Sequence, residues 1–132
     1  MHVPKDERVA RWRAAAQQDR DLAQSIVKTF PHLACYHAQQ AAEKALKAAI
    51  TALQGDAVPT HLGRTLLAAL SDLGALPPGE VRVAVLALDA YYIPTRYPDA
   101  LDFADAAAMY GAEEARAAVA QADLVLRWVD ER

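Results

Sequence analysis

Alanine, which makes up roughly a quarter of the residues, is the feature that most constrains what this chain can fold into. Alanine has the highest intrinsic helix propensity, and β-branched residues, which favour strands, are few. The sequence therefore predicts an all-α fold. Because 132 residues can form one compact core but are too few for two ordinary domains, we expect a single domain over residues 1–132.

Proline and glycine divide the chain into five predicted helices. The residue before a proline is biased away from helix, and glycine commonly follows the last helical turn. Thr60 is suited to cap the third helix with its side-chain oxygen. Asp89 comes directly after the apolar residues of the fourth helix, where an acid needs solvent or a partner. The predicted helices cover about residues 4–30, 31–53, 61–73, 78–92 and 111–129.

Charge, cysteine content and motifs exclude several functional classes. The net charge of −3 provides no long-range positive field, so non-specific binding to nucleic acids or anionic membranes is not expected. His32, Cys35 and His37 lack the further ligands that a tetrahedral metal site needs. Glycine-rich phosphate loops, HExxH, GxSxG, a signal peptide and a membrane-length apolar segment are all absent from the sequence. We therefore expect a cytoplasmic protein with no metal, no cofactor and no membrane contact.

The segment HAQQAAEKALKAA carries a polar stripe on the second predicted helix. His37, Gln40, Lys44 and Lys47 follow one another at steps of three and four residues and therefore lie along one helical face. Glu43 lies beside them at the spacing that allows an ion pair with Lys47. Two interpretations stay open: an ordinary solvated face, or a surface that binds a partner helix or a phosphate.

The segment YYIPTRYPDALDF places Arg96 between two prolines, directly after the fourth predicted helix. A guanidinium is permanently charged, and its planar fork suits phosphate or carboxylate. Tyr91 and Tyr97 provide aromatic faces and hydroxyls nearby. The spacing is equally compatible with a structural role, in which Arg96 bonds the last helical carbonyls or an acid such as Asp99, and with a role in binding a ligand.

Taken together, several segments resemble the HEPN domain, a nucleotide-binding domain named for its occurrence in higher eukaryotes and prokaryotes. The resemblance covers nearly the whole chain in order, and QQAAEKALKA and RYPD are its most specific parts. The segments that carry it are the first-helix tryptophan with DRDL, then YHAQQAAEKALKAA, PTHLGRTLLAAL, YYIPTRYPD and GAEEARAAVAQADLVLRWV.

The resemblance implies an up-and-down bundle of four main helices with a short extra helix, usually paired into a homodimer. Such domains are commonly encoded beside a minimal nucleotidyltransferase, with which they form a toxin–antitoxin-like pair. Many members are metal-independent ribonucleases that carry an arginine followed after four to six residues by a histidine. Here the matching positions after Arg96 are Leu101, Asp102 and Phe103, so the group that would transfer protons is missing from this motif.

We therefore expect a HEPN domain with little or no catalytic activity that dimerises and binds a minimal nucleotidyltransferase, a nucleotide, or both. Two alternatives are a metal-independent HEPN ribonuclease toxin, with RNA as substrate and His61 or Tyr97 as acid or base, and a purely structural dimerisation module. The predicted phosphate-binding and nucleotide-binding residues are Arg96, Lys44, Lys47, Tyr97 and Tyr91, and the predicted supporting residues are Asp19, Glu43, Gln40 and His61.

Overall fold

The computed structural model describes residues 2–92 and 110–132, and these residues form helices and connecting turns without any strand. The all-α prediction is therefore confirmed. Arg96 and Tyr97 fall in residues 93–109, outside the described part of the chain. Across the two described ranges, no helix combines the length and the apolar character needed to cross a bilayer. The helices are α1 (Lys5–Ser25), α2 (Pro31–Gln54), α3 (Gly63–Asp72), α4 (Gly79–Asp89) and α7 (Ala112–Asp130).

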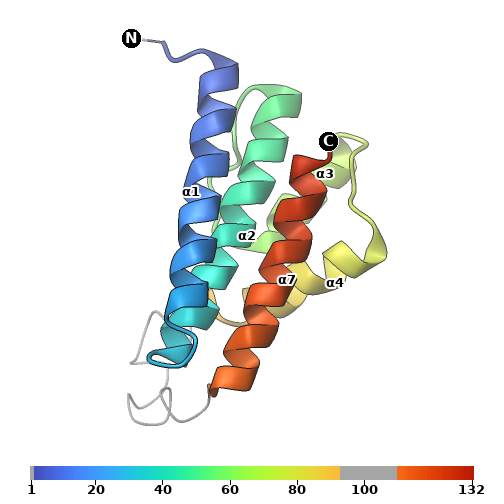
Figure 1. Ribbon diagram of the computed structural model, residues 1–132. Helices are drawn as coiled ribbons and strands as arrows, with labels where there is room; N and C mark the ends of the chain where they lie inside the picture. Colours follow the sequence, from blue (N-terminus) through green and yellow to red (C-terminus); the bar gives the residue numbers. More distant parts are fainter. Residues whose placement is uncertain (1, 93–109) are drawn as a thin grey trace.

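Helix α2 is the central element, and the long helices α1 and α7 lie along it (Figure 1). The shorter α3 and α4 pack against α2, and α4 also contacts α7. Small side chains allow neighbouring helices to approach α2 closely. The buried alanines of α2, each at most 7% exposed, are Ala34, Ala38, Ala41, Ala42, Ala45, Ala48 and Ala49.

The helix boundaries agree with the predicted ones to within a few residues, with one larger difference. Helix α2 ends at Gln54, one residue beyond the predicted limit, and Gly55 caps it with a φ of 96°, in the left-handed region that glycine tolerates. Helix α1 ends at Ser25, five residues before the predicted end at Phe30. The chain forms a turn over residues 26–29, in which the amide of Phe30 still donates to the carbonyl of Ile26 at 2.8 Å.

The start of α3 differs from the prediction. Thr60 does not cap the helix, because its Oγ1 accepts from the amide of Leu62 at 3.2 Å and α3 begins only at Gly63. The free amides of Gly63 and Arg64 donate instead to the carboxylate of Asp89, at 2.6 and 3.0 Å. Asp89, for which the sequence indicated no partner, therefore caps the neighbouring helix α3.

Candidate functional site

The first part of the candidate site joins α1 to α2 through Asp19. His37 Nδ1 lies 3.0 Å from Asp19 Oδ1, and Lys44 Nζ donates to Asp19 Oδ2 at 2.5 Å. His37 and Lys44 are two helical turns apart and therefore lie on the same face of α2. Burial raises the pKa of Asp19, but the hydrogen bonds and charges of His37 and Lys44 together outweigh it and hold this pKa below its ordinary value.

The second part joins α2 to the residues before α3 through Glu43. Lys47 Nζ donates to Glu43 Oε2 at 3.2 Å, and the two side chains are only 8% and 3% exposed. The other carboxylate oxygen, Oε1, lies 3.4 Å from His61 Nδ1 but makes no hydrogen bond within the described residues. The Trp12 ring covers Lys47, with Nζ 5.3 Å from the ring centre. An ordinary solvated face is therefore the wrong interpretation for Glu43 and Lys47.

A run of aromatic rings connects these two parts. His61 stacks on Tyr92, with ring centres 5.2 Å apart and planes 11° apart. The ring centres of Tyr92 and Tyr36 are 6.4 Å apart, and the ring of Tyr36 meets that of His37 edge-on with centres 5.1 Å apart. The His61 side chain is 55% exposed, so one part of this run is open to solvent. We call Asp19, His37, Lys44, Glu43, Lys47 and His61, with Tyr36 and Tyr92, the polar cluster.

The polar cluster combines two imidazoles, two carboxylates and two lysines with the rings of Tyr36 and Tyr92. Each imidazole lies beside a carboxylate that can orient the ring. The His61 side chain is also partly open to solvent, and flat rings of this kind can stack on other flat rings, as His61 does on Tyr92. Lys44, with 28% of its side chain exposed, is a more accessible cation than the covered Lys47.

Tyr91 differs from its neighbour Tyr92 in its contacts. Its hydroxyl donates to Glu114 Oε1 at 2.8 Å, and its ring meets Tyr110 edge-on at 5.6 Å. Burial, followed by the bond to Glu114, raises the pKa of Tyr91. Burial and the Glu114 charge also raise the pKa of the Cys35 thiol to about 12, so this cysteine is a protonated core residue rather than a nucleophile.

The structure brings together some of the predicted site residues and adds others. Asp19 and Glu43 pair with Lys44 and Lys47 as the sequence hypothesis expected, although a binding role for any of them stays a prediction. The amide oxygen of Gln40 is buried without a hydrogen-bond partner in the described ranges. Sequence reasoning missed Gln39, which is 2% exposed and donates from Nε2 to the carbonyl of His61 at 3.1 Å.

Metal binding finds no support in the described residues. Within residues 2–92 and 110–132, no three or more histidine, cysteine, aspartate or glutamate side chains are grouped so that they could hold a metal ion. In particular, His37 and His61 each face a single carboxylate, Asp19 and Glu43 respectively. The polar cluster is therefore described by its ion pairs and its aromatic contacts.

Comparisons with known proteins place this arrangement in a family. The sequence-family model of the HEPN domain matches residues 9–132 of this chain. A search of curated protein sequences found no match. The crystal structure of TT1696 from Thermus thermophilus superposes with a TM-score of 0.78 at 37% identity, covering 94% of this chain and 97% of that one. The crystal structure of ST0689, an archaeal HEPN homologue, gives a TM-score of 0.72 at 29% identity, covering 93% and 95%. The chain belongs to the HEPN domain family.

Proposed function

We propose that this HEPN domain forms a dimer and binds a nucleotide, a minimal nucleotidyltransferase or both, in a toxin–antitoxin-like system and with little or no catalysis of its own. The observation that carries the proposal is the exposed His61 side chain, which stacks on Tyr92, lies beside the Glu43–Lys47 pair and is connected through aromatic rings to the Asp19–Lys44 pair. A nucleotide needs a flat face for its base and fixed cations for its phosphates. The polar cluster presents both kinds of group.

The phosphate is assigned to Lys44 and Arg96 rather than to Lys47. Both lysines are paired with a carboxylate, but Lys47 is covered by Trp12 and its side chain is 8% exposed against 28% for Lys44, so the role of Lys47 in this proposal is to hold Glu43 in place. Arg96 follows Tyr92 by four residues, a stretch that spans at most ~14 Å even when fully extended. Tyr97 and Tyr91 are assigned to the rim of the site, and Gln40 to its polar floor.

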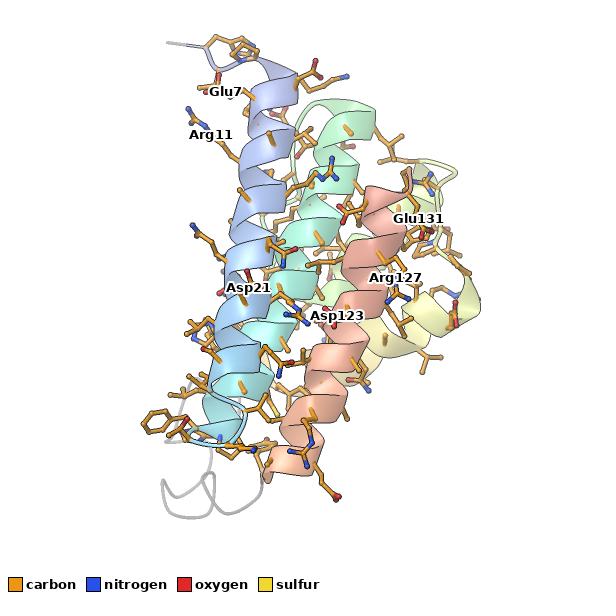
Figure 2. The ribbon with its side chains drawn as sticks, viewed as in Figure 1. Glu7, Arg11, Asp21, Asp123, Arg127 and Glu131 are labelled. Atoms are coloured by element: carbon orange, nitrogen blue, oxygen red, sulfur yellow. The ribbon has the colours of Figure 1, made fainter. Side chains whose placement is uncertain are left out.

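Calorimetric titration of ATP and GTP tests the nucleotide site. We expect the wild type to bind at least one of them and Arg96→Ala to bind about 10-fold to 100-fold more weakly, because a hydrogen-bonded charge contributes about 1.5–3 kcal/mol. Arg127→Ala is the matched control, because Arg127 is an exposed arginine on α7 (Figure 2). Equal affinities of the wild type and Arg96→Ala would remove Arg96 from the site.

A cleavage assay on the wild type and His61→Ala distinguishes this proposal from a ribonuclease. The proximity of His61 to Glu43 favours the ribonuclease as the second candidate, because a carboxylate beside an imidazole can orient it for proton transfer. With unstructured RNA in EDTA we expect no cleavage. Cleavage by the wild type that is lost in His61→Ala would contradict the non-catalytic proposal and support the ribonuclease.

For the dimer, we propose that the outer face of α4 is the contact surface. Val83 and Leu86 lie one turn apart on this helix and are 66% and 51% exposed. A second copy of the same helix, running antiparallel, would cover both side chains. Along α4, Glu80 and Asp89 are equally far from the midpoint between Val83 and Leu86. In an antiparallel pair, Glu80 of one copy would therefore lie at the same end as Asp89 of the other. The exposed Arg64, whose amide bonds Asp89, brings positive charge to that end.

Leu86→Glu tests this surface. We expect the wild type to sediment as a dimer at micromolar concentration and Leu86→Glu as a monomer, because each copy would bury an unpaired charge in an apolar contact. Leu22→Glu on α1 is the matched control, because Leu22 is a comparably exposed leucine, at 43%. A monomeric wild type would overturn the dimer, and a dimeric Leu86→Glu would overturn the choice of face.

A further inference from the structure

An apolar cavity of about 280 Å³ lies at the end of the bundle where α1 begins and α2 and α7 end. Ala48, Ala49 and Ala52 of α2 form its floor, and Val9 of α1 and Val129 of α7 contribute to its walls. In Figure 1, α1 and α7 diverge toward this end. Alanine side chains are too short to fill the space between diverging helices, so the cavity follows from the sequence of α2. It shares no lining residue with the polar cluster.

Cations surround the mouth of the cavity. Arg13 and Arg132 line it, and Lys5 Nζ donates to the carbonyl of the floor residue Ala52 at 3.3 Å. Arg13 Nη2 donates to Asp130 Oδ1 at 2.8 Å, which uses one of the five N–H donors of a guanidinium. Arg13, Arg132 and Lys5 therefore bring three cationic side chains to the mouth, and Asp130 is an acid that bonds one of them.

Other charges nearby are directed elsewhere. Figure 2 shows Glu7 and Arg11 on the side of α1 that points away from α7, where they bond each other at 2.8 Å. Glu131 lines a separate depression together with Arg127 and Glu80 of α4. The Arg132 guanidinium is positioned by the Trp128 ring, whose centre lies 4.4 Å away. The guanidiniums of Arg13 and Arg132 therefore each have a fixed partner and still keep donors for an anion.

We propose that this cavity binds a single-chain aliphatic carboxylate, a fatty-acid-type anion of roughly eight to ten carbons. The floor and walls are aliphatic, which suits an alkyl chain, and the rim arginines suit a carboxylate head. The length follows from the volume: a water molecule occupies about 30 Å³ in the liquid, and a methylene group is of similar size. The alkyl chain lies on the alanine floor, and the carboxylate accepts hydrogen bonds from Arg13 and Arg132.

Calorimetric titration of decanoate into the full chain tests the proposal. We expect decanoate to bind and octanoate to bind about 15-fold more weakly, because each buried methylene contributes about fourfold in affinity. Decanol, which has the same alkyl chain and no charge, is expected to bind at least ~10-fold more weakly than decanoate. Absence of decanoate binding, or equal binding of decanol and decanoate, would overturn the assignment of an aliphatic anion.

Two variants locate the ligand. Ala52 is an exposed residue of α2 that lines the cavity, so Ala52→Phe is expected to fill the cavity mouth and abolish decanoate binding. The control is Ala120→Phe, at an exposed alanine of α7 that does not line the cavity, and it is expected to leave decanoate binding unchanged. Arg132→Gln, at an exposed end of the chain, is expected to weaken decanoate binding about 10-fold and to leave decanol binding unchanged. Decanoate binding that survives both Ala52→Phe and Arg132→Gln would overturn the proposal. The proposal would also be overturned if decanoate did not bind and Ala52→Phe abolished self-association. In that case a second copy of the chain, rather than a fatty-acid-type anion, would occupy the cavity.

Discussion

Lys47→Met is expected to lower the free energy of unfolding by about 3–5 kcal/mol, because it leaves the carboxylate of Glu43 buried without its cation. Glu43 and Lys47 are 3% and 7% exposed as residues. After the substitution, His61 Nδ1, 3.4 Å from Oε1, is the ion-pair partner that the described residues still offer this carboxylate, and Oε1 already lacks a hydrogen bond there. Methionine keeps most of the apolar stem under Trp12, so the loss of stability is due to the missing charge rather than to poorer packing.

Urea denaturation followed by circular dichroism measures this loss, and two variants act as controls. Lys44→Met is expected to cost less, because Asp19 is more exposed than Glu43 and keeps its contact with His37. The double variant Glu43→Gln with Lys47→Met is expected to recover most of the stability, because no buried charge remains. If the losses of stability caused by Glu43→Gln alone and by Lys47→Met alone simply add in the double variant, the ion pair is not the cause of the loss.

Gly63→Ala is expected to destabilise the protein by about 2–4 kcal/mol, although alanine is favoured over glycine by about 1 kcal/mol inside a helix. A Cβ at Gly63 would overlap Val85 Cγ1 and would lie 2.9 Å from Asp89 Oδ1. It would therefore force α3 away from α4 and weaken the cap that Asp89 provides. Calorimetry should show a melting temperature lower by roughly 10 °C for a domain of this size.

Gly79→Ala is the matched control for this prediction. Gly79 is the first residue of α4, and a Cβ there would meet only Arg82 Nη2, at an ordinary distance of 3.7 Å. We expect Gly79→Ala to change the melting temperature little. Equal stability of the two variants would show that α3 and α4 do not pack as closely as the Asp89 cap requires.

The helices were predictable because their signals are local. Alanine propensity, the prolines at 31 and 78 and the left-handed Gly55 act within a few residues of each boundary. The same local reasoning failed at Thr60, because the cap of α3 comes from Asp89, which is 26 residues from Gly63 in the chain. A side chain that arrives from another helix leaves no mark near the boundary that it caps.

The candidate site was predictable only along a single helix. The spacing of four residues correctly paired Glu43 with Lys47 and placed His37 and Lys44 on one face of α2. No spacing indicated that His61, 18 residues beyond Glu43, would lie beside it. Gln39 went unnoticed because a buried glutamine and an exposed one look alike in an alanine-rich helix.

The sequence by itself determined the helical class, the approximate helix limits and the pairs of charges that share a helical face, since each of these depends on neighbours within one or two turns. The tertiary structure alone decided which of those charges are buried. Trp12 covers Lys47, and Asp19 reaches across from α1 to Lys44. These contacts exist because alanines on α2 let the other helices approach closely, and the same alanines leave the apolar cavity open where α1 and α7 diverge.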